Sequence, residues 1–299
     1  MNAKSKRGVV VAMLILFPWA AVCAQEIEEV IKVEVALVTV NVLVTDAKGQ
    51  PRPGLQAADF RVTEEGKPMR VEFFDHLGAA SIVFVIDLSS SMRGDKWKKL
   101  KAGMKKFLTN AHSGNDNTLI GFSDQPRIMA RSINEEELWQ VVDSVTPYGN
   151  TALYDAVLLG FTVLDQIAQR HKALVLFSDG EDNSSIADLV EVKKQALMHS
   201  ATIYTVGILN ENYTVPLADG RTGKELLKDL ASVTGGLAHF PTSSEITRVL
   251  EEIRADLTSR YSLSYYPADK QTGWRRIEVS VTPRPDRVRL RYQQRYLVK

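Results

Sequence analysis

Five side chains with hard oxygen donors stand where a parallel β-sheet would bring them together. They are Asp87, Ser89, Ser91, Thr151 and Asp179. The first three directly follow the apolar run 81–86, the last follows the apolar run 173–177, and Thr151 opens a long helical pattern. Open parallel sheets bind ligands at the carboxyl ends of their strands, so we expect these side chains to share one edge. Carboxylate and hydroxyl oxygens without His or Cys favour Mg²⁺ or Mn²⁺ and disfavour zinc.

Each fragment also has an ordinary explanation when it is taken alone. Asp-x-Ser-x-Ser is usually a turn with a helix N-cap, Thr151 alone is an N-cap, and Asp179-Gly180 alone is a turn. Their occurrence together, in order and each at a strand end or helix start, favours a metal site. Asp182 and Asn183 are open to two interpretations, an outer layer of that site or a solvated loop, and the solvated loop is favoured.

The five residues resemble the metal-ion-dependent adhesion site of von Willebrand factor A domains, as in integrin I domains. Every position of that pattern is filled, and the resemblance covers about residues 81–259. It implies that the two serines contact the metal directly, with Thr151 or an Asp according to state, while the remaining acidic groups act through water. It also implies that an acidic side chain of a protein partner completes the octahedral coordination of the metal ion. The function implied is a metal-dependent protein-binding or adhesion module without catalytic activity.

The middle of the chain alternates strand and helix patterns. Strands are expected at 81–86, 117–122, 173–177, 201–208 and 236–240, and helices at 96–111, 135–145, 152–168, 186–199, 224–233 and 245–257. This alternation predicts an α/β fold with a doubly wound, mostly parallel sheet covered by helices on both faces. The A-domain resemblance implies the same Rossmann-like architecture.

Both ends of the chain show the period of two that is typical of half-buried strands. Near the N-terminus the apolar phase slips within 33–44, which predicts a β-bulge or a strand buried on both faces, and 60–64 and 69–74 read as a hairpin. Three more strands are expected at 261–265, 277–281 and 288–292. Each set is too small for a core of its own, so we expect both to pair into one antiparallel β-sandwich with the α/β domain inserted between them.

The predicted organisation has four segments. They are a signal peptide at 1–24, the first part of the sandwich at 25–78, the A domain at 79–259 and the second part of the sandwich at 260–299. The whole layout also resembles the secreted von Willebrand A-related proteins abundant in Acidobacteria.

The first residues have the layout of a secretory signal peptide. Lys4, Lys6 and Arg7 precede an apolar stretch at 9–21, and small residues precede a cut before Gln25. This predicts a secreted or periplasmic protein, with an uncleaved N-terminal anchor as the alternative. The only cysteine, Cys23, lies in the removed segment. No later stretch approaches 18 apolar residues, so we expect no membrane span after signal cleavage.

Composition and motifs exclude several classes of function. With 37 basic and 36 acidic residues the net charge is +1, which gives no footprint for nucleic acid. The sequence contains no Walker loop, no Gly-x-Gly-x-x-Gly and no Gly-x-Ser-x-Gly. Two alternatives stay open: a structural subunit of an envelope assembly that ignores the metal, and a metal-assisted hydrolase with Asp87 or Asp179 as base.

Overall fold

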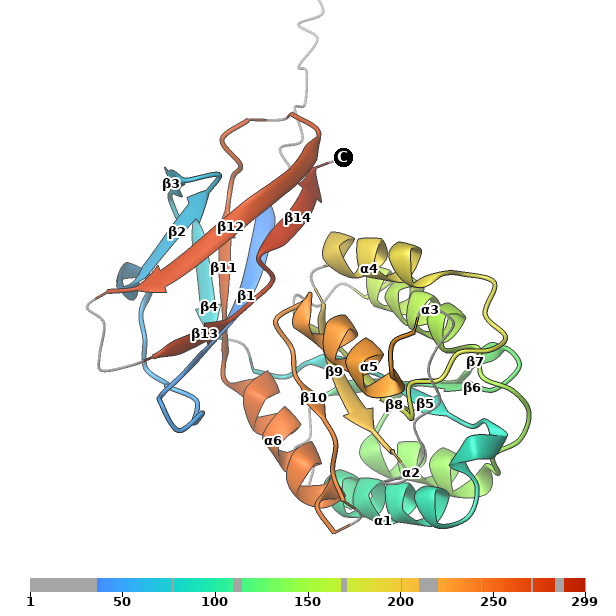
Figure 1. Ribbon diagram of the computed structural model, residues 1–299. Helices are drawn as coiled ribbons and strands as arrows, with labels where there is room; N and C mark the ends of the chain where they lie inside the picture. Colours follow the sequence, from blue (N-terminus) through green and yellow to red (C-terminus); the bar gives the residue numbers. More distant parts are fainter. Residues whose placement is uncertain are drawn as a thin grey trace, which may run out of the picture. The chain divides into compact units, whose positions relative to one another are not determined.

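The computed structural model describes residues 37–76, 78–109, 115–167, 171–199, 201–209, 220–242, 244–269, 271–282 and 288–298 (Figure 1). All of them fall within one compact unit, residues 35–299. The predicted signal peptide, the N-terminal part of the strand predicted within 33–44 and residue 287 lie outside the described residues. Among the helices that are described, none is long and apolar enough to cross a membrane.

The α/β part is built on a six-stranded sheet in the order β10-β9-β8-β5-β6-β7. Its strands are β5 (Ser81–Asp87), β6 (Asp116–Phe122), β7 (Pro126–Ile133), β8 (Lys172–Ser178), β9 (Thr202–Gly207) and β10 (Ala238–His239). All neighbouring strands run parallel except β7, which pairs antiparallel with β6 at one edge. Every residue of β5 is buried, because its continuous apolar run faces helices on both sides of the sheet.

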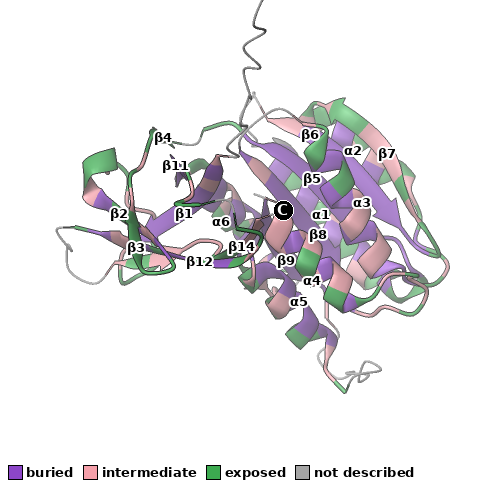
Figure 2. Cartoon of the chain, turned by 90° about the horizontal axis from the view of Figure 1, so that it is seen from above, coloured by how far each residue is buried: buried purple, intermediate pink, exposed green. Residues whose placement is uncertain are grey.

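Six helices cover the two faces of this sheet. They are α1 (Asp95–Thr109), α2 (Glu135–Ser144), α3 (Leu153–Asp165), α4 (Leu189–Met198), α5 (Gly223–Ser232) and α6 (Ile246–Thr258). One core cluster joins α1, α2 and α6 to alternate residues of β5 such as Phe84, and the other joins α3, α4 and α5 to the residues between them, such as Val85. Figure 2 shows the strands of this sheet, such as β5 and β8, largely in the purple of buried residues. The doubly wound, mostly parallel sheet predicted from the alternating pattern is confirmed.

The strands from both ends of the chain form two four-stranded antiparallel sheets, in the orders β13-β1-β11-β4 and β14-β12-β2-β3. The strands are β1 (Val38–Thr45), β2 (Phe60–Glu64), β3 (Lys67–Met69), β4 (Phe73–His76), β11 (Arg260–Tyr265), β12 (Gly273–Val281), β13 (Arg289–Arg291) and β14 (Arg295–Val298), and a 3₁₀ turn, Ala57–Asp59, precedes β2. One core cluster contains residues of both sheets, and the rings of Phe60 and Tyr261 lie 5.3 Å apart across it.

The two ends therefore share one sandwich, as predicted. Val38 of β1 lies opposite Tyr265 of β11, although more than 200 residues separate them in the sequence. In the sequence, the α/β part lies between β4 and β11. The residue boundaries given above for the four segments stay predictions.

Several local predictions are wrong or incomplete. The segment 69–74 is not one strand: β3 forms the hairpin with β2, whereas β4 belongs to the other sheet and pairs with β11. The chain has to leave the hairpin because Phe74 packs into the sandwich core beside Tyr261. The edge strand β7 and the short strand β14 are not in the sequence-based set. The helix expected from 186 begins at Leu189, and Ile186 lies in the loop before it.

The strand β1 resolves the phase slip at the N-terminus. Six consecutive residues from Val40 to Thr45 are buried, and the register with β11 runs from Val38 to Leu43 without interruption. Of the two interpretations, the strand buried on both faces is therefore correct over the described part of this segment.

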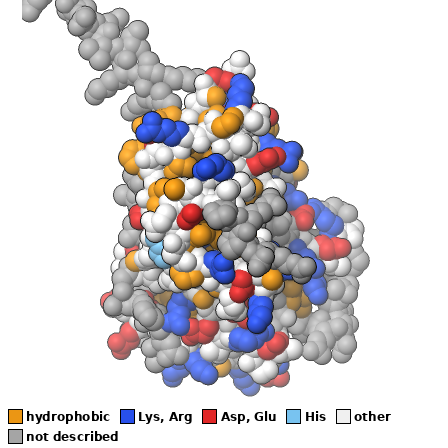
Figure 3. All heavy atoms as spheres, turned by 90° about the vertical axis from the view of Figure 1, so that its left-hand side faces the viewer, with side chains coloured by type: hydrophobic (Ala, Val, Ile, Leu, Met, Phe, Trp, Pro, Cys, Tyr) orange, Lys and Arg blue, Asp and Glu red, His pale blue; other side chains and the backbone are white. Residues whose placement is uncertain are grey.

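The sandwich face of the molecule carries charges of both signs, interspersed with apolar side chains (Figure 3). This fits the near-neutral net charge and shows no single-sign field on that face.

Candidate metal centre

Asp87 is the last residue of β5 and is fully buried, with 0% of its surface exposed. One carboxylate oxygen, Oδ1, accepts the backbone N–H of Ser89 at 2.9 Å, and Oδ2 accepts the hydroxyl of Ser178 at 2.7 Å. No Lys, Arg or His among the described residues forms an ion pair with this carboxylate. A buried charge without a counter-charge is costly, so the site is built to receive a cation or a proton.

The two serine hydroxyls connect the end of β5 to the end of β8. Ser89 Oγ lies 3.1 Å from Ser91 Oγ, and Ser91 Oγ donates to Asp179 Oδ2 at 2.7 Å. Asp179 follows β8, the parallel neighbour of β5, so the two carboxylates meet at the same edge of the sheet. Among the described residues neither hydroxyl makes a capping bond to a helix: Ser89 is the N-cap residue of the 3₁₀ turn Ser90–Met92 but makes no side-chain bond to it, and Ser91 lies within that turn, ahead of α1.

Thr151 lies in the loop before α3, and this loop is bound to the Asp87–Ser91 segment. The Tyr148 N–H donates to Leu88 O at 2.6 Å, and the Ser90 N–H donates to Gly149 O at 3.0 Å. Thr151 is 2% exposed, and it precedes the N-cap residue of α3 rather than being it. Within the described chain, its hydroxyl has no hydrogen bond with the other four candidates. Side-chain hydrogen bonds thus link Ser89, Ser91 and Asp179. The carboxylate of Asp87 joins them through the backbone N–H of Ser89, and backbone bonds bring the Thr151 loop beside them.

The electrostatics of the site are dominated by the burial of Asp87. Burial, and secondly the charge of Asp179, raise the pKa of Asp87 to about 7, against the opposing hydrogen bonds from Ser89 and Ser178. Glu181, two residues after Asp179, is half-buried. The pKa of Glu181 is raised, because burial and the charge of Asp179 outweigh the opposing effect of Lys96. The field at this edge of the sheet is therefore negative and favours a bound cation.

The residues present fit a divalent metal of the Mg²⁺ type. Their donors are carboxylate and hydroxyl oxygens, and one carboxylate is buried without a cation among the described residues. Over the same residues there is no group of three or more His, Cys, Asp or Glu that could hold a metal. A metal at this edge would therefore depend on the hydroxyls of Ser89 and Ser91 as well as on the acids.

Sequence reasoning missed two supporting residues, Lys96 and Ser178. Lys96 forms an ion pair with Asp179 Oδ2 at 3.0 Å, and Ser178 anchors Asp87. Asn183 Oδ1 accepts the N–H of Thr151 at 2.8 Å, while Asp182 Oδ1 accepts the N–H groups of the first two residues of α3. Asp182 and Asn183 lie in the loop after β8, as the favoured interpretation has it, and Asn183 is exposed, but both also hold the Thr151 segment in place.

Gly180 allows a second helix to begin beside the site. Its φ is +83°, and a Cβ at this position would lie 2.5 Å from the carbonyl oxygen of Gly223, the first residue of α5. Any larger residue would push the start of α5 away from the turn that holds Asp179. The partly positive N-terminus of α5 consequently lies against this turn.

The fold and the site define a class of protein: a doubly wound α/β domain with an oxygen-donor site at the carboxyl edge of its parallel sheet. The chain belongs to the von Willebrand factor type A domain family, whose model matches residues 81–256.

Relatives and solved structures agree with this membership. The chain is 26% identical over 143 residues to inter-alpha-trypsin inhibitor heavy chain H1 of Sus scrofa, covering 42% of this chain and 16% of that protein. It is 21% identical over 207 residues to heavy chain H2 of Mus musculus, covering 62% of this chain and 21% of that protein. A solved von Willebrand factor type A structure from Catenulispora acidiphila is similar with a TM-score of 0.52 and 13% identity, over 80% of this chain and 72% of that one. The match thus spans about a fifth or less of the length of these two curated relatives.

Proposed function

We propose that this chain is a divalent-metal-dependent protein-binding module of the adhesion type, without catalytic activity. Its metal, Mg²⁺ or Mn²⁺, would be held by an intact metal-ion-dependent adhesion site. The residues assigned to it are Asp87, Ser89, Ser91, Thr151 and Asp179. Its partner would be a protein that supplies an acidic side chain to the metal.

The observation that carries this proposal is the state of Asp87. Its carboxylate is fully buried, both of its oxygens are already oriented by hydrogen bonds, and no cation among the described residues pairs with it. Two acids share this edge of the sheet, and the charge of Asp179 raises the pKa of Asp87 further. A divalent cation would remove both the desolvation cost and the repulsion.

The hydrogen bonds indicate how the residues would divide the work. Ser91 donates its proton to Asp179 and accepts the proton of Ser89, which leaves one lone pair of the Ser91 oxygen available to a cation. Asp87 holds the backbone of Ser89 and so fixes the start of the same loop. A metal bound largely by neutral hydroxyls keeps most of its charge, and it then attracts an anionic group from outside. This chemistry suits the capture of a carboxylate on a partner.

We further propose that the protein acts outside the cytoplasm, either secreted or in the periplasm, and that residues 1–24 are a cleaved signal peptide. The domain boundaries proposed with it are 25–78, 79–259 and 260–299. The layout also supports a place among the secreted von Willebrand A-related proteins abundant in Acidobacteria.

The proposal is tested by capture of envelope or secreted proteins on the immobilised protein, with Mg²⁺ and with EDTA. We expect capture that EDTA abolishes and added Mg²⁺ restores. Asp87→Ala should remove capture while the fold stays intact, because β5 is held by apolar burial on both faces. Thr151→Ala should weaken capture more than metal binding. Capture that is equally strong in EDTA and in Asp87→Ala would favour a subunit that uses other surfaces.

A further inference from the structure

Lys96 lies at the edge of the proposed metal site. It is the second residue of α1, and only 14% of its side chain is exposed. Its ammonium group, Nζ, lies 3.0 Å from Asp179 Oδ2, the same oxygen that accepts the hydroxyl of Ser91 at 2.7 Å. Asp179 is thus already paired with a cation of the same chain, whereas Asp87 has no cationic partner among the described residues.

The formal charges show what this ammonium does. With Asp87 and Asp179 both ionised and Lys96 present, the site carries −1 without a metal and +1 with a divalent cation. Without Lys96 it would carry −2 and 0. The half-buried Glu181 lies in the same field and lowers all four values by one, so it does not alter the differences between them.

We infer that Lys96 is a specificity-determining residue of this site: it weakens metal binding and strengthens the attraction of the loaded site for an anionic group. The inference rests on the proposed function. Two cations placed close together repel, so a metal enters a site with Lys96 less readily than one without it. Once the metal is in place, the extra positive charge is relieved by a carboxylate from a partner.

A coupling between metal and anion follows from this. If the anion binds more tightly to the metal-loaded site, then the metal must bind more tightly when the anion is present, by the same factor. Lys96 would therefore make the module engage metal and acidic partner together rather than hold the metal permanently.

The test is calorimetric titration of the purified protein with MnCl₂, without and with acetate as a simple carboxylate. Lys96→Met is compared with Lys96→Arg, which keeps the charge, and with Lys98→Met, which removes a charge from an exposed position of the same helix. We expect Lys96→Met to bind Mn²⁺ about tenfold more tightly than the wild type, while the two controls stay within about twofold of it. Acetate should tighten Mn²⁺ binding in the wild type and do so less in Lys96→Met.

The possible results separate the inference from the proposed function. If the wild type and Lys96→Met bind Mn²⁺ equally, or the variant binds more weakly while its circular dichroism and melting show an intact fold, the inference is overturned and the metal site stands. An equal gain in Lys98→Met would also overturn it, because the effect would then be one of general charge. If no variant and no wild type binds Mn²⁺, the proposed function itself fails, and the inference fails with it.

Discussion

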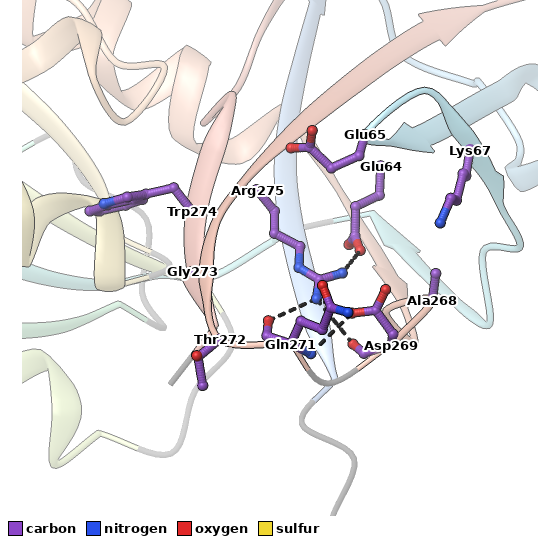
Figure 4. Close-up of a pocket in the computed structure, with 10 residues that line it drawn as sticks. All are labelled: Glu64, Glu65, Lys67, Ala268, Asp269, Gln271, Thr272, Gly273, Trp274 and Arg275. Atoms are coloured by element: carbon purple, nitrogen blue, oxygen red, sulfur yellow. Dashed lines mark hydrogen bonds and ion pairs between the residues drawn. The ribbon is translucent and has the colours of Figure 1, made fainter.

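Two buried carboxylates in this molecule, those of Glu64 and Asp87, differ in whether the described residues supply a cation to them. Glu64, at the end of β2 in the sandwich, is 1% exposed. Its Oε1 accepts a hydrogen bond from Arg275 at 2.7 Å, and its Oε2 accepts the hydroxyls of Tyr265 and Tyr296 at 3.0 and 2.6 Å. Figure 4 shows Arg275 reaching Glu64 and also Asp269, beside a cavity of about 310 Å³. Asp87, at the edge of the parallel sheet, is equally buried, but among the described residues only Ser89 and Ser178 donate to it.

The difference lies in the source of the counter-charge. Glu64 receives its cation from its own chain, so the pair is complete when the chain has folded. The junction of the sandwich and the α/β part follows the same rule, because Asp256 of α6 pairs with both the buried Arg260 and Arg291. Asp87 receives no cation from the described residues, and we propose that a bound metal ion supplies its counter-charge.

The largest effect on stability is expected at the completed pair. Glu64→Gln removes the carboxylate opposite Arg275, whose side chain is 9% exposed, and leaves Asp269 as its one acidic partner among the described residues. We expect the free energy of unfolding to fall by about 3 kcal/mol, as when one member of a buried ion pair is lost. Urea denaturation measures this change. Glu72→Gln, at the exposed pair with Arg70, is the control and should cost less than about 1 kcal/mol. Equal costs for the two variants would contradict the comparison.

Asp87→Asn should behave in the opposite way. In EDTA the amide removes a buried acid without a counter-ion, and Ser178 can turn its hydroxyl to accept from the new NH₂ group. We expect the metal-free variant to be at least as stable as the wild type by urea denaturation, and to gain nothing from Mg²⁺. A loss as large as that of Glu64→Gln would mean that Asp87 is a structural residue.

In EDTA, the dependence of stability on pH should differ between the wild type and Asp87→Asn. The pKa of Asp87 is raised to about 7 in the folded state, from 3.8, so its folded form retains a proton that the unfolded form has lost. Its contribution to stability therefore falls as the pH rises from about 4 to 7. Burial lowers the pKa of His171 from 6.5 to about 4, so the contribution of that residue rises with pH between about 4 and 6.5.

In the wild type these two slopes oppose each other between about pH 4 and 6.5. In Asp87→Asn the falling slope is removed and the rising slope of His171 stays, so stability should increase with pH more steeply than in the wild type. Urea midpoints measured across this range check the sign. Parallel profiles for the two proteins would show that Asp87 does not titrate in this window.

The smallest effect is expected at Asp182. Its Oδ1 accepts the N–H groups of Leu153 and Tyr154 at 2.8 and 3.2 Å and so caps the start of α3. Asp182→Ala should cost about 1 kcal/mol of stability, typical of a lost helix cap. It should also lower Mg²⁺ affinity modestly, because α3 begins two residues after Thr151. Thermal melting with and without Mg²⁺ measures both effects. An unchanged affinity would mean that the Thr151 loop is fixed by other contacts.

Much of the α/β part could be predicted because its signals are local. The continuous apolar runs of β5 and β8 are typical of strands buried on both faces, and the candidate acids follow them directly. The edge strand β7 is absent from the sequence-based set because none of its residues is buried and its pairing is irregular, with two register shifts against β6. Edge strands need not be apolar on either face.

Pairings between distant parts of the chain could not be predicted. Phe73–His76 pairs with β11, almost 190 residues away, rather than with its neighbour in sequence. The contacts of Lys96 and Ser178 with the candidate acids span 83 and 91 residues. Residue types and spacing identify groups that could bind a metal, but the cation that already contacts one of them is visible only in the fold.

The most direct test of the account is the melting temperature of the wild type in EDTA and in excess Mg²⁺ or Mn²⁺, beside Asp87→Asn. A ligand present at one hundred times its dissociation constant stabilises the folded state by about 2.7 kcal/mol. For a chain of this size, this corresponds to a rise of about 5–10 °C. We predict this rise in the wild type and none in Asp87→Asn. A wild-type melting temperature that is the same in EDTA, Mg²⁺ and Mn²⁺ would contradict the claim that Asp87 awaits a metal.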